Sequence, residues 1–443
     1  MSERQPATLR KTLGYWDLVA YGLAYIAPIA PLSTIGFVWD ESAGLVVLAY
    51  LLGAACMYFT ARSYATMCEE VPNAGSVYAF ARLGLGRFAG FMAGWMILLD
   101  YLLIPALLYV LASIAMGTLL PQVGRWVWIV LTMGITLFFN WFGIRVTTRV
   151  NFAFLALQAV MLLAFLALAL VALYGGKGDG ALTLRPLFDA ATFNAGKIFS
   201  ATSICVLSFL GFDAISTLAE ETKDGSGKTV GRAIMGTLVA ATVIFVVQTW
   251  IMGDLLPGMH IQDLAAAPFE LAHWAVGAGF AAFMAWVVAL VNGFSNPVPM
   301  QAGVARVLFA MGRDRQLPSA LGRVHPKYGT PYVSMLASSA LSLVIALAMR
   351  NKLDELASIV NFGALTGFAL LHLSVLNRFA VNMRSRRIFV HWIVPLVGLG
   401  VVLAVLTGMS QYALDVGISW MAVGLIYGFA LRARNRDEIR AVI

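Results

Sequence analysis

The chain has 443 residues, of which 60% are hydrophobic and only 12% are charged. Soluble domains usually carry about 25% charged residues, so this composition and the mean hydropathy of +0.83 exclude an ordinary soluble protein. They indicate a polytopic helical membrane protein. The net charge of +8 comes from basic residues that stand between apolar segments rather than along one face. That pattern is typical of orientation in a bilayer and excludes a nucleic-acid partner.

The three cysteines and five histidines are scattered along the chain. They give neither a disulfide framework nor the spacing of metal ligands. No Ser/His/Asp or Cys/His constellation for nucleophilic catalysis is evident. We therefore expect no enzyme activity, no cofactor and no metal ion.

Twelve apolar stretches are long enough to cross about 30 Å of hydrocarbon, which takes about 20 helical residues. In chain order they cover residues 15–38, 43–66, 86–118, 125–143, 150–174, 196–219, 231–254, 272–310, 331–349, 355–376, 390–409 and 412–431. The first of them is expected to act as an uncleaved signal-anchor. Most of the 30 Lys and Arg residues fall in the connections on one side. The positive-inside rule therefore predicts that both termini are cytoplasmic.

Two of these spans contain breaks. Pro28 and Pro31 interrupt the first span, and Gly211-Phe212-Asp213 interrupts the sixth. Broken helices at corresponding positions of two halves indicate an inverted-repeat transporter, and five spans in each half would invert the second half in the membrane. The predicted parts are an N-terminus (1–14), a first repeat (15–174), a second repeat (196–376), two further helices (390–431) and a C-terminus (432–443).

Asp100 and Asp213 are the acidic residues that lie well inside long apolar segments, with no Lys or Arg at comparable depth. A charged side chain there costs roughly 2.5–3.5 kcal/mol, so it persists where it meets a cation, a proton path or a cavity. At the break beside Asp213, free backbone carbonyls would also attract an ammonium group. Asp100 precedes Tyr101, which suits a cation by stacking, but adjacent helical residues point about 100° apart. The cation prediction therefore rests mainly on Asp213.

Further candidates come from the two breaks and from the eighth span. Because Pro28 and Pro31 have no N–H to donate, the first break is poorly suited to a substrate carboxylate. The eighth span offers amides, for which hydrogen bonding between helices is the alternative reading, as it is for Asn361. The predicted substrate site comprises Asp213, Phe212, Gly211, Ser208, Tyr101, Asp100, Tyr25, Ile26, Ala27, Pro28, Asn296 and Gln301. Glu220 and Glu221 are candidates for gating or proton coupling, or form a solvated helix end.

Several stretches resemble the amino acid–polyamine–organocation (APC) superfamily. They are SFLGFDAISTLAEETKD (208–224), PNAGSVY (72–78), AMGRDRQLP (310–318) and VHPKYGTP (324–331). Within that superfamily, the stretches 8–28, 94–105, 206–222 and 359–368 are most similar to bacterial putrescine importers. The resemblance implies twelve helices with a 5+5 inverted-repeat (leucine-transporter-like) core, and import by alternating access. It also implies that Tyr101 handles substrate and that Asp213 is the acidic residue of the family's G-F-D break.

The sequence departs from that pattern at two places. Gln158 stands about where many proton-coupled members carry a lysine, so proton coupling would need a carboxylate or give way to exchange. The stretch 295–301 contains two prolines that are not associated with the importers, so the substrate can differ.

We therefore predict a secondary transporter in a bacterial inner membrane. It would import putrescine or a related polyamine, and an amino acid permease for cationic or neutral amino acids, working by proton symport or exchange, is the alternative. A membrane sensor on the same scaffold is a third hypothesis. The expected partners are a small cationic substrate, protons as a candidate coupling ion and the lipid bilayer, and the chain is expected to be a monomer or a homodimer.

Overall fold

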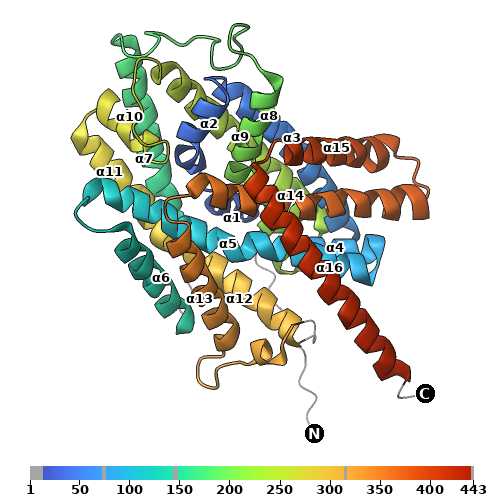
Figure 1. The fold of residues 1–443 in the computed structure, drawn as a ribbon. Helices are drawn as coiled ribbons and strands as arrows, with labels where there is room; N and C mark the ends of the chain where they lie inside the picture. Colours follow the sequence, from blue (N-terminus) through green and yellow to red (C-terminus); the bar gives the residue numbers. More distant parts are fainter. Residues whose placement is uncertain (1–12, 72–75, 143–147, 314–316, 441–443) are drawn as a thin grey trace.

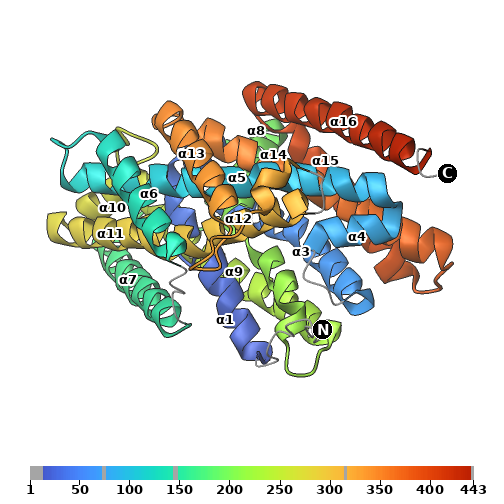
Figure 2. The same ribbon diagram turned by 90° about the horizontal axis from the view of Figure 1, so that it is seen from below.

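The computed structural model describes residues 13–71, 76–142, 148–313 and 317–440. This part of the chain is helical throughout, apart from one isolated bridge between Leu13 and Thr222. Figures 1 and 2 show the helices packed side by side around a central helix, α5. Inside a membrane no water is available to the backbone, and a helix satisfies its backbone hydrogen bonds within itself.

The α-helices are α1 (Tyr15–Ile26), α2 (Ile35–Glu41), α3 (Val46–Glu70), α4 (Ser76–Leu85), α5 (Arg87–Leu119), α6 (Arg125–Trp141), α7 (Thr148–Tyr174), α8 (Ala195–Phe209), α9 (Gly227–Leu255), α10 (Ala267–Ala275), α11 (Ala278–Leu290), α12 (Pro297–Arg313), α13 (Tyr332–Ala348), α14 (Leu353–Val375), α15 (Val394–Thr407) and α16 (Gln411–Arg440). Shorter 3₁₀ segments are η1 (Ala30–Ser33), η2 (Phe212–Glu221) and η4 (Ser319–Gly322). Three segments are π-helical, namely η3 (Val291–Ser295), η5 (Leu376–Asn382) and η6 (Phe389–Ile393).

Among the described residues, nine helices are long and apolar enough to cross a membrane, and a tenth span results if the bent pair 15–33 and 35–41 is counted. The chain is therefore a multi-pass membrane protein. α6 and α13 occupy two more of the predicted segments but have only 17 residues each. The predicted segment 272–310 is wrong at its start. Gly277 has a φ of +125°, which ends α10, and the long helix begins at Ala278.

The buried centre of the fold is α5. Within its apolar window 89% of the residues are buried, because α4, α11, α14 and α16 all pack against it. By contrast, only 22% of the corresponding window of α16 is buried, and Figure 2 shows this helix along one edge of the molecule. The side chains of α16 that no other helix covers are available to face lipid.

Both predicted breaks are present in the structure. α1 ends at Ile26, Ala27 takes a φ of +61°, and the chain passes through η1 into α2 with a bend of 54°. In the sixth span α8 ends at Phe209, Gly211 takes a φ of +119°, and the chain continues as the 3₁₀ helix η2. Pro28 cannot supply the N–H that would continue α1, and glycine tolerates the left-handed conformation at 211.

Candidate functional site

The two breaks touch each other in the interior. A Cβ atom placed on Gly211 would lie 3.0 Å from Tyr25 Cδ1 and 3.2 Å from the backbone nitrogen of Ile26. A Cβ atom on Gly22 would lie even closer, 2.5 Å from Ile215 Cδ1 of η2, so two glycines allow α1 and η2 to approach. The structure therefore brings Tyr25, Ile26 and Gly211 together at one point.

Asp213 lies in the first turn of η2, directly after the Gly211 break. Its side chain is only 5% exposed, and its Oδ1 accepts a hydrogen bond of 3.2 Å from the Gly211 N–H. None of the ion pairs found in the described part of the chain involves this carboxylate. Asp213 is thus held in place by the break itself, and its carboxylate has no ion-pair partner among the described residues.

Asp100 lies on α5, where that helix closely approaches Gly363 of α14. It is 4% exposed, and its Oδ1 is buried without a hydrogen-bond partner. The charges of Asp100 and Asp213 are near enough to interact. Two buried carboxylates without a basic partner repel each other, so a cation or a proton between them would stabilise the pair.

Three tyrosine side chains lie near enough to Asp213 to interact with its charge. Tyr25, Tyr64 and Tyr101 come from three different helices, and each interacts electrostatically with the Asp213 carboxylate. Tyr101 is partly exposed, and the rings of Tyr21 and Tyr25 lie 5.7 Å apart. Aromatic faces and phenol oxygens around a carboxylate suit an organic cation, because the ring attracts the cation and the oxygen accepts its hydrogen bonds.

Phe212 lies among buried aromatic rings. Its ring is 5.8 Å from Tyr64 and 6.0 Å from Phe368, and the side chain has no exposed surface. These contacts fix the first turn of η2 against α3 and α14. The structure thus gives Phe212 a clear part in positioning Asp213, whereas direct contact with substrate remains a prediction.

Ser208 joins three helical segments through hydroxyl groups. Its Oγ lies 3.1 Å from the Tyr50 hydroxyl and 3.3 Å from Thr34 Oγ1, and Thr34 and Tyr50 are 2.7 Å apart. On the neighbouring side, Gln248 of α9 donates a hydrogen bond of 3.0 Å to the carbonyl oxygen of Pro28. Both predicted residues, Ser208 and Pro28, therefore have partners within the protein.

A small cavity lies beside Tyr25. It has a volume of about 30 Å³ and is lined by Tyr21, Ala24, Tyr25, Gln158, Ser295, Asn296, Pro299 and Met300. The Oε1 atom of Gln158 is buried there without a partner. Because a water molecule needs roughly 10–15 Å³, the cavity has room for water, and a substrate would have to widen it. The structure thus places Asn296 and Gln158 at one cavity next to the site.

Gln301 lies in a different environment. Its Oε1 accepts a hydrogen bond of 2.9 Å from the Tyr109 hydroxyl, and its Nε2 contacts Ser339 Oγ. The Asn361 amide similarly donates to the carbonyl oxygen of Ser203 at 2.7 Å. For both residues this arrangement matches the alternative reading of hydrogen bonds between helices.

Two predicted residues fall outside the described side chains. Glu220 and Glu221 form the end of η2, but the structure does not describe where their side chains lie. The motif residues 72–75 are likewise outside the described residues. The gating or coupling role of the two glutamates therefore stays a prediction.

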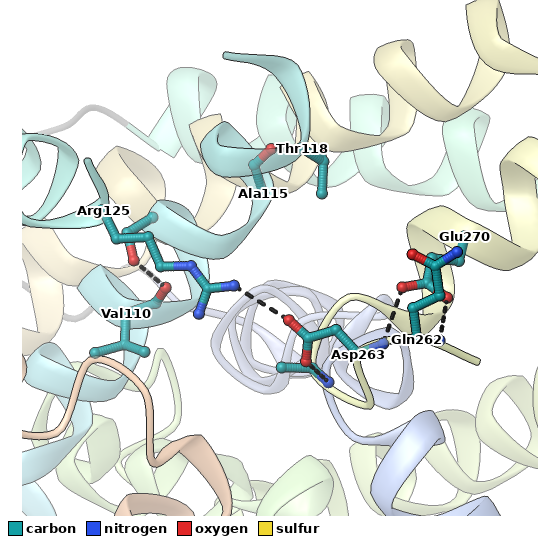
Figure 3. A network of polar contacts seen from close by, with 9 residues as sticks. Val110, Ala115, Thr118, Arg125, Gln262, Asp263 and Glu270 are labelled. Carbon is teal, nitrogen blue, oxygen red and sulfur yellow. Dashed lines mark hydrogen bonds and ion pairs between the residues drawn. The ribbon is translucent and has the colours of Figure 1, made fainter. Parts of the chain in front are cut away.

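The helix that follows the first break, α2, is packed against a later connection of the chain. The connection between α9 and α11 packs onto α2, with the carbonyl oxygen of Leu264 against Gly36. As Figure 3 shows, Arg125 and Asp263 form an ion pair of 3.1 Å that ties this connection to α6. The Glu270 carboxylate accepts hydrogen bonds from the backbone at 262 and 263, also drawn in Figure 3. Both carboxylates are buried, and the cavity beside Tyr25 is small.

The fold and the site, together with comparisons with known proteins, define the class of protein. A multi-pass helical protein with two interrupted spans meeting at an unpaired carboxylate has the features of a membrane transporter. The amino acid permease family model matches residues 17–426, nearly the whole chain. The chain therefore belongs to the amino acid permease family, whose members are transporters and not enzymes.

Individual relatives have different substrates in their names. The low-affinity putrescine importer PlaP of Escherichia coli K12 is 32% identical over 95% of this chain and 93% of its own length. The branched-chain amino acid permease BcaP of Bacillus subtilis is 29% identical over 98% of this chain and 95% of its own. The chloroplastic cationic amino acid transporter 7 of Arabidopsis thaliana is 26% identical over 84% of this chain and 66% of its own.

Several residues near the site were not predicted from the sequence. Gln248 donates a hydrogen bond to the first break, Tyr50 contacts Ser208, and Tyr64 interacts electrostatically with Asp213. Gln248 could have been found from the sequence, because a polar side chain inside an apolar span indicates a functional or structural role, as it does for Asp213. The two tyrosines give no such signal, since nothing in a single sequence shows which way each ring points.

Proposed function

We propose that this protein imports a small organic cation, putrescine or a related polyamine, by alternating access. The observation that carries the proposal is the pair of buried carboxylates, Asp213 and Asp100, which interact with each other and have no ion-pair partner in the described residues. A diamine carries two ammonium groups and would neutralise both. The 32% identity to a putrescine importer over nearly the whole chain supports this substrate class.

The backbone of the first break supports a substrate without a carboxylate. Pro28 and Pro31 have no N–H, and the N–H groups of Ala27, Ala30 and Thr34 already donate hydrogen bonds within this segment. The Gly211 N–H is likewise engaged by Asp213. Few donors remain for the α-carboxylate of an amino acid, which is anionic and would also meet two negative side chains.

An amino acid permease is the second candidate. It is favoured by the family model and by the 29% identity to a branched-chain amino acid permease. In this case the backbone of the first break would rearrange to bind the carboxylate, and Asp213 would contact the amino group.

Thermal stabilisation of the purified full-length protein separates the two candidates. Putrescine, cadaverine, arginine, ornithine and valine would each be titrated against the unfolding midpoint. The diamine proposal expects stabilisation by putrescine and cadaverine. Stabilisation by amino acids alone would contradict it and support the permease. Uptake of the stabilising compound into proteoliposomes then tests transport itself.

The finer architecture is part of the same proposal. We propose twelve spans, with α6 and α13 among them, and two inverted repeats over residues 15–174 and 196–376. Two further spans (390–431) follow, and residues 1–14 and 432–443 lie on the cytoplasmic side of a bacterial inner membrane. Cysteine labelling from each side of inverted and right-side-out vesicles, with cysteines introduced at Ser2 and Ile443, tests the orientation.

Coupling is proposed to use a carboxylate or to be replaced by exchange, because Gln158 cannot take up a proton. Glu220 and Glu221 are the proposed coupling or gating groups. Uptake driven by an imposed pH gradient supports symport, whereas a requirement for preloaded internal substrate supports exchange.

A further inference from the structure

The turn between α14 and α15 carries a dense group of basic residues. Arg378, Arg384, Arg386 and Arg387 fall within ten residues, and the sequence has no Asp or Glu from 376 to 393. In Figures 1 and 2 the two helices run out together to the right-hand edge of the molecule, and their connection forms a projecting tip. We call residues 378–393 the basic tip. It is remote in sequence from every residue of the substrate site.

Most of this positive charge is not neutralised. Arg378 forms an ion pair of 2.6 Å with Glu70 of α3. Arg384, Arg386 and Arg387 are exposed, and no ion pair of theirs occurs in the part of the chain that the structure describes.

One more arginine adds to this charge from α3. Arg62 and Arg387 both interact electrostatically with His391, as does the acidic Glu69. Four arginines therefore stand against one remaining carboxylate, and the local excess is positive.

The turn that displays the arginines is well defined. The Oγ atom of Ser385 lies 2.7 Å from His391 Nδ1, and the backbone nitrogen of Ser385 donates to the carbonyl oxygen of Phe379 at 2.9 Å. The imidazole of His391 stacks on the ring of Phe379 at 4.5 Å with an interplanar angle of 20°. These contacts order the turn, so an anion that binds the guanidinium groups loses little freedom of the chain.

Apolar side chains lie next to the arginines. Ile388 and Phe389 are 62% and 61% exposed, and Trp392 is 39% exposed on the same turn of chain. A membrane places acyl chains next to phosphate groups, and basic clusters beside membrane helices attract anionic headgroups. The combination of unpaired guanidinium groups and exposed apolar side chains has the two chemistries of a phospholipid.

We propose that the basic tip binds an anionic phospholipid, with its phosphate against Arg384, Arg386 and Arg387 and its acyl chains along Ile388, Phe389 and Trp392. The bound lipid would anchor the α14–α15 hairpin to the leaflet that it faces. A soluble phosphate ester lacks the acyl chains and is expected to bind much more weakly.

Trp392 provides a reporter at the site itself. The full-length protein is reconstituted into vesicles in which brominated phosphatidylglycerol or brominated phosphatidylcholine replaces part of the lipid. Quenching of tryptophan fluorescence is measured, and the Trp392 contribution is obtained by subtracting the signal of Trp392→Phe. The preference of the wild-type protein for phosphatidylglycerol is compared with the preference of the double variant Arg386→Gln/Arg387→Gln. The variant Arg323→Gln/Lys327→Gln removes the same charge from exposed residues of another loop and is the matched control.

The expected result is a clear preference for phosphatidylglycerol at Trp392, which the control retains. At about fivefold in affinity for each arginine near a membrane surface, the Arg386→Gln/Arg387→Gln variant should weaken that preference by roughly 25-fold. Salt at 1 M, where charges are screened beyond about 3 Å, should weaken it in the wild type, and this measurement does not depend on any variant folding.

Other outcomes would overturn the proposal. These are equal quenching by the two lipids, a preference that survives both the double substitution and 1 M salt, and an equal loss of preference in the control. Displacement by millimolar glycerol phosphate would show that the occupant is a soluble phosphate ester.

Discussion

Replacing Asp213 by asparagine removes one charge at the site while keeping the shape of the side chain. The substituted amide can still accept the Gly211 N–H on its carbonyl oxygen, so the turn after the break should persist. Its second oxygen, however, becomes an NH₂ donor that faces an ammonium group unfavourably. At an effective dielectric constant of about 20, two unit charges 4 Å apart interact by about 4 kcal/mol.

Part of this energy is offset by the cost of removing the charges from water. A loss of about 3 kcal/mol is therefore a reasonable value for a charge-assisted hydrogen bond in this buried setting. This loss corresponds to a putrescine dissociation constant that is roughly 100-fold higher. Uptake at substrate concentrations near the wild-type dissociation constant should fall below detection.

The assay is putrescine binding by isothermal titration calorimetry on purified protein, followed by uptake of labelled putrescine into proteoliposomes. Asp254→Asn is the matched control. Asp254 is a fully buried carboxylate on α9, but it accepts hydrogen bonds from Thr183 at 2.6 and 2.9 Å and lies away from the two breaks. This control should keep the wild-type affinity for putrescine. A correctly folded Asp213→Asn protein that binds and transports putrescine like the wild type would refute the ammonium contact.

Three further substitutions probe the surroundings of Asp213. Asp100→Asn removes the second charge, so it should weaken putrescine binding by roughly tenfold and affect a monoamine such as butylamine less. Both affinities are measured by calorimetry, and an equal effect on the two amines would contradict the two-ended contact. Gly211→Ala should lower the thermal unfolding midpoint and slow uptake. The residue has a φ of +119° and the new Cβ would meet Tyr25 at 3.0 Å, which together cost about 1–3 kcal/mol. The control Gly134→Ala places its Cβ in open space and should change neither quantity. Gln248→Leu should destabilise the protein by about 1–3 kcal/mol in denaturant unfolding, because the Pro28 carbonyl loses its donor, and an unchanged stability would show that water replaces the amide.

The spans and their breaks could be predicted because they depend on local chemistry. A long apolar stretch forms a helix in lipid, and a proline or a glycine can interrupt it, as at Pro28 and Gly211, although α5 continues through Pro105. The predicted start of the eighth span was wrong because a local turn ends the helix that precedes it. Its apolar composition continues through 272–277, and hydropathy does not register the left-handed turn at Gly277.

The partners of the polar side chains could not be predicted in the same way. Ser208 meets Tyr50, and Gln301 meets Tyr109, across 158 and 192 residues of sequence. Such contacts depend on how each helix is rotated about its own axis. Apolar helices in lipid are hydrophobic on every side, so the periodic pattern that reveals rotation in a soluble helix is weak: α5 and α7 are apolar all around.

Helix rotation also determines how Asp100 and Tyr101 lie relative to Asp213. Adjacent positions on α5 point in different directions, so Asp100 and Tyr101 were expected to compete for one site. In the structure Asp100 is buried at the contact with α14, Tyr101 is partly exposed, and both still interact with Asp213. Electrostatic interaction reaches farther than contact, so two residues on different faces of one helix can act on the same charge. A flexible diamine could use this arrangement, with one end at Asp213 and the other at Asp100, whereas a monoamine would leave one carboxylate without a counter-charge. The electrostatic interaction between the two buried carboxylates therefore favours a substrate with two cationic ends.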